Sequence, residues 1–177
     1  MSYKIRTNRF SIRKLFWAAL CALVFCVAAQ ANDGWDVGTE LPDLTSFNLS
    51  GELPETKGNV VLVDFWASWC APCKASFPSM EETYQQYKDK GFKIVAVSVD
   101  SKAMSMESFV NRLKPSFSIV HDSEQKLVSE AGIEVMPTSF LVDKSGKIRF
   151  VHLGWHGKES AERLMAEVEQ LLTEEPS

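Results

Sequence analysis

The stretch VVLVDFWASWCAPCK, residues 60–74, decides the fold, because it places two cysteines shortly after an apolar, β-branched run. Residues 60–66 are almost continuously apolar, as expected for a central strand that is covered on both faces. Cys70 and Cys73 follow in a C-x-x-C spacing. A strand that leads two cysteines into the first turn of a helix indicates a dithiol/disulfide redox centre.

The two cysteines have different expected roles. At the start of a helix, unpaired backbone N–H groups and the positive end of the helix dipole favour a thiolate over a thiol. Cys70 is therefore the candidate nucleophile. Cys73 lies three residues later on the same helix face, so it is the candidate resolving thiol that attacks a mixed disulfide on Cys70.

A zinc half-site and a structural disulfide are the other interpretations of the cysteine pair. Residues 32–177 contain no second C-x-x-C or C-x-x-H to complete four zinc ligands, so no metal site and no cofactor are expected. A bridge between cysteines three residues apart closes a very short loop and constrains the unfolded chain little. His121, His152 and His156 show no ligand pattern and are expected at the surface or in loops.

Asp64 is the one charged residue in the apolar run 60–66. A carboxylate buried in a strand is unfavourable unless it is paired or protonated, so we expect its pKa to be raised. A carboxyl group with a perturbed pKa is often a functional group. The alternative is a structural carboxyl that is bonded to backbone at the end of the sheet.

Strands and helices alternate along the rest of the chain. Apolar spacing predicts strands at residues 92–99, 117–120, 138–142 and 147–153, and helices at 70–90, 103–113, 123–131 and 158–172. The turn-rich segment 32–59 predicts an N-terminal β-hairpin that covers one edge of the sheet. This order predicts an α/β domain with a central mixed β-sheet flanked by helices on both faces.

The first 31 residues have the pattern of a secretory signal peptide. Residues 1–14 carry basic residues and no acid, residues 15–29 are apolar, and small residues follow at 29–31. The apolar stretch is shorter than the roughly 18 to 20 residues of a spanning helix, which favours cleavage and a mature domain at 32–177. An uncleaved leader that anchors the protein to the inner membrane is the alternative.

The charge balance of the predicted mature domain is acidic. All 23 acidic residues lie beyond the leader, whereas part of the 19 basic residues lies within it. An acidic domain argues against nucleic acid and against anionic membrane surfaces as partners.

Residues 63–74 resemble the active-site stretch of the thioredoxin superfamily, and Met136-Pro137-Thr138 matches the superfamily's cis-proline loop. Three features are similar to its exported TlpA-like and ResA-like branch: LPDL at 41–44, Phe77-Pro78 after the cysteines, and a helix inserted between residues 100 and 117. The resemblance covers residues 38–172 and implies a thioredoxin-like fold.

The resemblance also implies a substrate site beside the cysteines. Pro137 is expected to follow a cis peptide bond, and the backbone of Met136 to pair with an extended substrate segment while its side chain touches the sulfurs. Trp69 would add an apolar rim. The alternative is a tight turn at Pro137 without substrate contact.

In thioredoxin an aspartate at the position of Asp64 lies behind the resolving cysteine and helps to move its proton. The resemblance implies the same role for Asp64. Two positions differ from the families: Ala96 falls where thioredoxin has a lysine partner, and Ser76 falls where ResA-like proteins often have a glutamate. The proton relay is therefore expected to depend on Asp64 alone.

These observations predict a periplasmic thiol-disulfide oxidoreductase that reduces disulfides in exported, cysteine-containing proteins through Cys70 and Cys73. A reductase in an oxidising compartment needs an electron source, and the resemblance implies a membrane thiol reductant of the DsbD type. Two alternatives stay open. One is a DsbA-like oxidase or isomerase, and the other is a Cu(I) carrier that uses Cys70, Cys73 and Met136 as soft ligands.

Overall fold

The computed structural model describes residues 34–175. The signal peptide predicted at residues 1–31 lies outside the described residues. Within the described part of the chain, no helix combines the length and the apolar character that crossing a membrane requires.

The domain is built on a six-stranded mixed sheet with the strand order β1-β4-β3-β2-β5-β6. The strands are β1 (Ser50–Gly51), β2 (Val60–Trp66), β3 (Phe92–Ser98), β4 (Ser118–His121), β5 (Thr138–Val142) and β6 (Ile148–Leu153). β2 pairs in parallel with β3 and antiparallel with β5. All seven residues of β2 are buried, so the apolar run forms the central strand as predicted.

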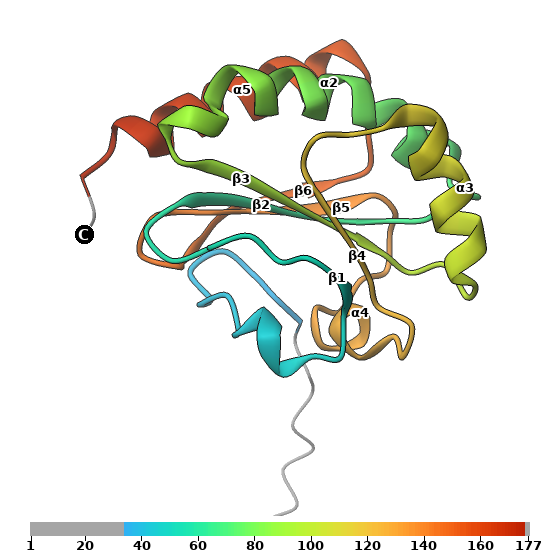
Figure 1. Ribbon diagram of the computed structural model, residues 1–177. Helices are drawn as coiled ribbons and strands as arrows, with labels where there is room; N and C mark the ends of the chain where they lie inside the picture. Colours follow the sequence, from blue (N-terminus) through green and yellow to red (C-terminus); the bar gives the residue numbers. More distant parts are fainter. Residues whose placement is uncertain (1–33, 176–177) are drawn as a thin grey trace, which may run out of the picture. The chain divides into compact units, whose positions relative to one another are not determined.

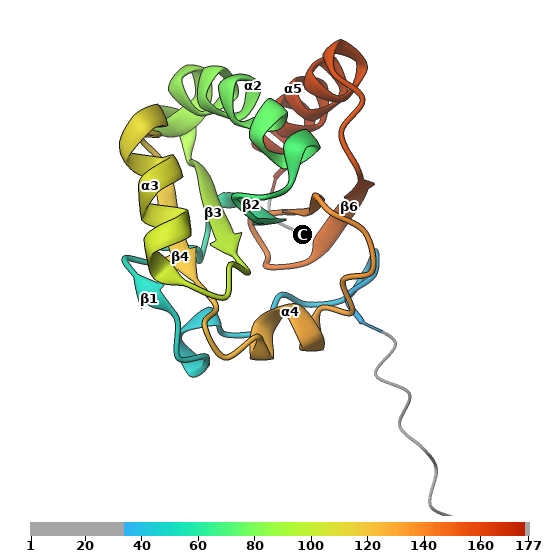
Figure 2. The ribbon, with the colours of Figure 1, turned by 90° about the vertical axis from the view of Figure 1, so that its right-hand side faces the viewer.

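Helices cover both faces of this sheet, which confirms the predicted α/β class. They are α2 (Ala71–Tyr87), α3 (Ala103–Leu113), α4 (Lys126–Glu130) and α5 (Lys158–Thr173). α2 and α5 lie side by side on one face, whereas α4 and residues 34–49 lie on the other (Figures 1 and 2).

Two clusters of aromatic rings fill the core, one on each face of the sheet. They consist of Trp66, Phe77 and Phe109 on the α2 face, and of Trp35, Phe65 and Phe140 on the opposite face. Successive residues of a strand point to opposite faces, so Phe65 and Trp66 belong to different clusters. The same alternation places Asp64 on the face of Trp66, beneath α2.

Residues 34–59, the described part of the predicted N-terminal β-hairpin, do not form a hairpin. The segment instead contains a 3₁₀ helix, η1 (Leu44–Ser46), and the short strand β1, which pairs with β4 at one edge of the sheet. The Asp43 carboxylate accepts hydrogen bonds from the backbone N–H of Thr45 at 2.9 Å and from its hydroxyl at 2.7 Å. These local bonds stabilise a turn where the sequence pattern predicted a strand.

Candidate active site

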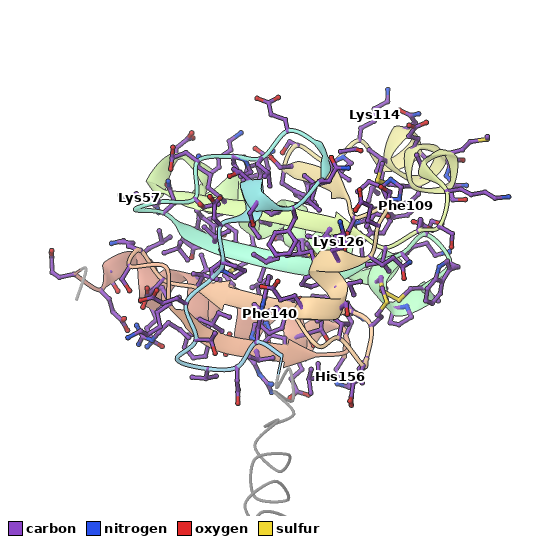
Figure 3. All side chains as sticks on the ribbon, turned by 90° about the horizontal axis from the view of Figure 1, so that it is seen from below. Lys57, Phe109, Lys114, Lys126, Phe140 and His156 are labelled. Carbon is purple, nitrogen blue, oxygen red and sulfur yellow. A yellow bond between two sulfur atoms is a disulfide. The ribbon has the colours of Figure 1, made fainter. Side chains whose placement is uncertain are left out.

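The two cysteines form a disulfide at the start of α2, seen as the yellow bond in Figure 3. Cys70 is the N-cap residue of α2, and its Sγ accepts a hydrogen bond from the backbone N–H of Cys73 at 3.2 Å. Cys70 is 5% exposed and Cys73 is fully buried. An incoming sulfur therefore reaches Cys70 first, and Cys73 lies behind it.

A buried carboxylate holds the loop that precedes Cys70. Asp100, at 2% exposure, accepts hydrogen bonds from the Ser68 backbone N–H at 2.9 Å and from the Ser68 hydroxyl at 2.7 Å. The Ser98 hydroxyl donates a third at 3.0 Å. His121 Nε2 donates to the Asp100 carbonyl at 2.7 Å. These bonds fix the loop against the end of β3.

Sequence reasoning missed this network. His121 is 4% exposed, so the prediction of a surface or loop position was wrong for this residue. The available clue was the position of Asp100, two residues beyond the end of β3. Because parallel strands such as β2 and β3 end at the same edge of a sheet, polar residues that follow them meet there.

The cis-proline loop lies at the same end of the sheet as the cysteine loop. The Met136–Pro137 peptide bond is cis, and Thr138 at the start of β5 pairs with Phe65 near the end of β2. Met136 is half-buried, whereas Trp69 is 68% exposed. The structure thus brings the predicted substrate residues and the cysteine pair to one end of the sheet.

Asp64 is buried at 1% exposure on the α2 face of β2. Its Oδ1 accepts a hydrogen bond from the Ser139 hydroxyl at 2.6 Å, and its buried Oδ2 has no hydrogen-bond partner within the described residues. Burial raises the pKa of Asp64 to about 7, although the bond from Ser139 acts to lower it. The residue beside Asp64 on β3 is Ala96, so that position supplies no cation to stabilise the charged form.

A cavity of about 70 Å³ lies against Asp64. Ser76 of α2 lines this cavity, and its hydroxyl donates to the carbonyl of Cys73 at 2.7 Å. The cavity therefore reaches the helical turn that carries the buried cysteine. A carboxyl group with a near-neutral pKa in this position can take up a proton near neutral pH.

Among residues 34–175, no group of three or more His, Cys, Asp and Glu side chains is placed to hold a metal ion. The chemistry available at this site is thiol-disulfide exchange at the Cys70–Cys73 pair, assisted by proton transfer.

Comparisons with known proteins agree with this geometry. A family model described as Redoxin matches residues 36–167. The thiol-disulfide oxidoreductase ResA from Bacillus thuringiensis (strain Al Hakam) is 36% identical over 171 residues, which cover 93% of this chain and 99% of the relative.

Two solved structures show the same fold. A candidate thiol:disulfide interchange protein DsbE from Chlorobium tepidum has a TM-score of 0.72 at 36% identity, covering 78% of this chain and 99% of that one. StoA from Bacillus subtilis has a TM-score of 0.56 at 32% identity, covering 63% of this chain and 84% of that one.

Proposed function

Because this chain belongs to the Redoxin family, within the thioredoxin superfamily, we propose that it is a ResA-type thiol-disulfide oxidoreductase that reduces disulfides in other proteins. The observation that carries this proposal is the arrangement of its cysteines. Cys70 caps the N-terminus of α2 and is 5% exposed, whereas Cys73, in the same disulfide, is fully buried.

The reaction runs in two exchanges. In the reduced protein, the thiolate of Cys70 attacks one sulfur of a substrate disulfide, forms a mixed disulfide and releases the first substrate thiolate. Cys73 then attacks Sγ of Cys70, which closes the Cys70–Cys73 disulfide and releases the second thiolate. Two electrons pass from the protein dithiol to the substrate, and the substrate thiolates take up protons from solution.

Asp64 supports the second exchange. Cys73 must lose a proton before it attacks, and the carboxylate of Asp64 accepts that proton through the region lined by Ser76. A base with a pKa of about 7 is suited to this step near neutral pH. This step releases the reduced substrate.

The cis-proline loop is the proposed substrate site. An extended substrate segment pairs with the backbone of Met136 next to Pro137, and the exposed ring of Trp69 covers apolar substrate side chains. Recognition through backbone bonds suits a protein that acts on several cysteine-containing substrates.

We further propose that the reaction takes place in the periplasm. The basic and apolar pattern of residues 1–31 supports export and cleavage, which leaves 32–177 as the working domain. Its substrates are then exported proteins with cysteines, and a membrane thiol reductant of the DsbD type returns the Cys70–Cys73 disulfide to the dithiol. If the leader is retained, the same domain works at the membrane surface.

The Cys73→Ser variant is expected to trap a substrate. In the domain 32–177 with Cys73 replaced, the mixed disulfide on Cys70 cannot be resolved, so a synthetic peptide disulfide should leave one peptide half bound per protein. Intact-mass measurement under non-reducing conditions checks this. Cys70→Ser is the matched control and should carry no adduct. Equal adducts on both variants would rule out the assignment of Cys70 as the attacking sulfur.

A further inference from the structure

A row of polar side chains leads from Asp64 across three strands to the edge of the sheet. Ser139 of β5 pairs with Asp64 of β2, and His152 of β6 pairs with Ser139. Directly opposed residues on neighbouring strands share a face, with Cβ atoms about 4.5 to 5.5 Å apart. Asp64, Ser139 and His152 also line the same cavity.

The row ends at a histidine–glutamate pair. His152 Nε2 lies 2.5 Å from Oε2 of Glu167, which is on α5. The two side chains are 19% and 16% exposed, in contrast to the 1% exposure of Asp64. The pair therefore lies closer to solvent than Asp64 does.

Asp64 has no direct contact with solvent through which to exchange a proton. Its Oδ1 is bonded to the Ser139 hydroxyl, and its Oδ2 is buried. The cavity volume of about 70 Å³ exceeds the roughly 10 to 15 Å³ that a cavity needs to hold one water molecule, so water fits beside the carboxyl. A hydroxyl and water molecules together can pass a proton along such a row.

Few other groups near the cavity could take that proton. α2 contributes Ser76 and Met80, and β3 places Ala96 beside Asp64. On α5, Arg163 is bonded to Glu159 at 2.8 Å, and a guanidinium keeps its protons. His156 lines the cavity from the loop after β6 and is exposed. His152 is the titratable group directly beside Ser139.

We propose that His152, oriented by Glu167, carries the proton between Asp64 and solvent through the Ser139 hydroxyl and the cavity. This inference rests on the proposed function, in which Asp64 accepts the proton of Cys73. The S–H bond of Cys73 breaks and an O–H bond forms on Asp64. The proton then passes to the imidazole of His152 and on to solution, which leaves Asp64 as a carboxylate for the next cycle.

The test is the turnover of a synthetic peptide disulfide, with dithiothreitol as the reductant. His152→Ala is expected to lower turnover about tenfold at about pH 6, because proton transfer by a positioned side chain is lost. Near pH 9 the loss should shrink below about twofold, because hydroxide then removes the proton directly. Added imidazole should restore turnover of this variant at the lower pH, since it replaces the missing carrier. His156→Ala is the matched control, and its turnover should be unchanged at both pH values.

Three results would overturn the relay. One is full activity of His152→Ala at about pH 6. Another is an equal loss at both pH values without rescue by imidazole, which is the pattern of a purely structural contact with Glu167. The third is full activity of Asp64→Asn at about pH 6. After the first or second result, the proposed function stands as long as Cys70→Ser is inactive. The third result also removes Asp64 from the proposed mechanism, but disulfide exchange by Cys70 and Cys73 stands as long as Cys70→Ser is inactive.

Discussion

Replacing Cys70 with serine is expected to reduce turnover of a peptide disulfide by about a thousandfold or more, as loss of a nucleophile does in other enzymes. A serine hydroxyl cannot form the mixed disulfide through which both exchanges pass. Cys70 is the N-cap residue of α2, and serine is among the preferred N-cap residues, so the fold should be retained. The loss therefore reports chemistry and not unfolding.

The measurement is steady-state reduction of the peptide with dithiothreitol, together with circular dichroism of the variant. Ser105→Ala, at an exposed position on α3, is a suitable control, because it removes a hydroxyl without touching the site. Its turnover should remain within about tenfold of the unmodified protein. A Cys70→Ser variant that retains a tenth of the turnover would contradict the assigned nucleophile.

Asp64→Asn is expected to raise the free energy of unfolding at about pH 8.5 by up to about 4 kcal/mol. Burial raises the pKa of Asp64 from 3.8 to about 7, so the folded state binds this proton more tightly than the unfolded state. The stabilisation that comes from this proton is fully present below pH 3.8 and is lost as the pH rises through about 7. Above that pH the folded protein holds a buried charge, which asparagine removes.

Urea denaturation at several pH values between about 5 and 8.5 checks this prediction. The free energy of unfolding of the unmodified protein should decrease as the pH rises and Asp64 loses its proton. In Asp64→Asn, the contribution of this residue to the slope of that free energy against pH should be absent. Asp89→Asn, at an exposed position on η2 (Lys88–Lys90), is the matched control and should keep the slope. Equal slopes for Asp64→Asn and the unmodified protein would contradict the raised pKa.

The spacing of apolar residues predicted the main helices and strands. These elements are stabilised by burying one apolar face, and that face produces the spacing. The helix predicted at residues 103–113 and the strand predicted at 138–142 have the observed bounds of α3 and β5. The helix predicted from residue 123 begins only at Lys126. There the Asp122 carboxylate accepts hydrogen bonds from the backbone N–H groups of Lys126 and Val128, a local contact that apolar spacing does not reveal.

The site was only partly predictable for a related reason. The two cysteines are recognisable in the sequence by their spacing. Asp64 is recognisable as a charged residue in an apolar strand. Asp100 acts on Ser68, which lies 32 residues earlier, and His152 contacts Glu167, which lies 15 residues later on a different element. Such contacts depend on strand order and helix packing, so they become visible only in the folded chain.

The equilibrium reduction potential of the Cys70–Cys73 couple tests the central claim, a protein-disulfide reductase, most directly. It is measured in dithiothreitol or glutathione buffers by tryptophan fluorescence, with Cys73→Ala as the redox-inactive control. A reductase is expected to give about −250 mV or lower, close to the roughly −270 mV of thioredoxin. A value near −120 mV, as in DsbA, would contradict the reducing direction and identify an oxidase or isomerase.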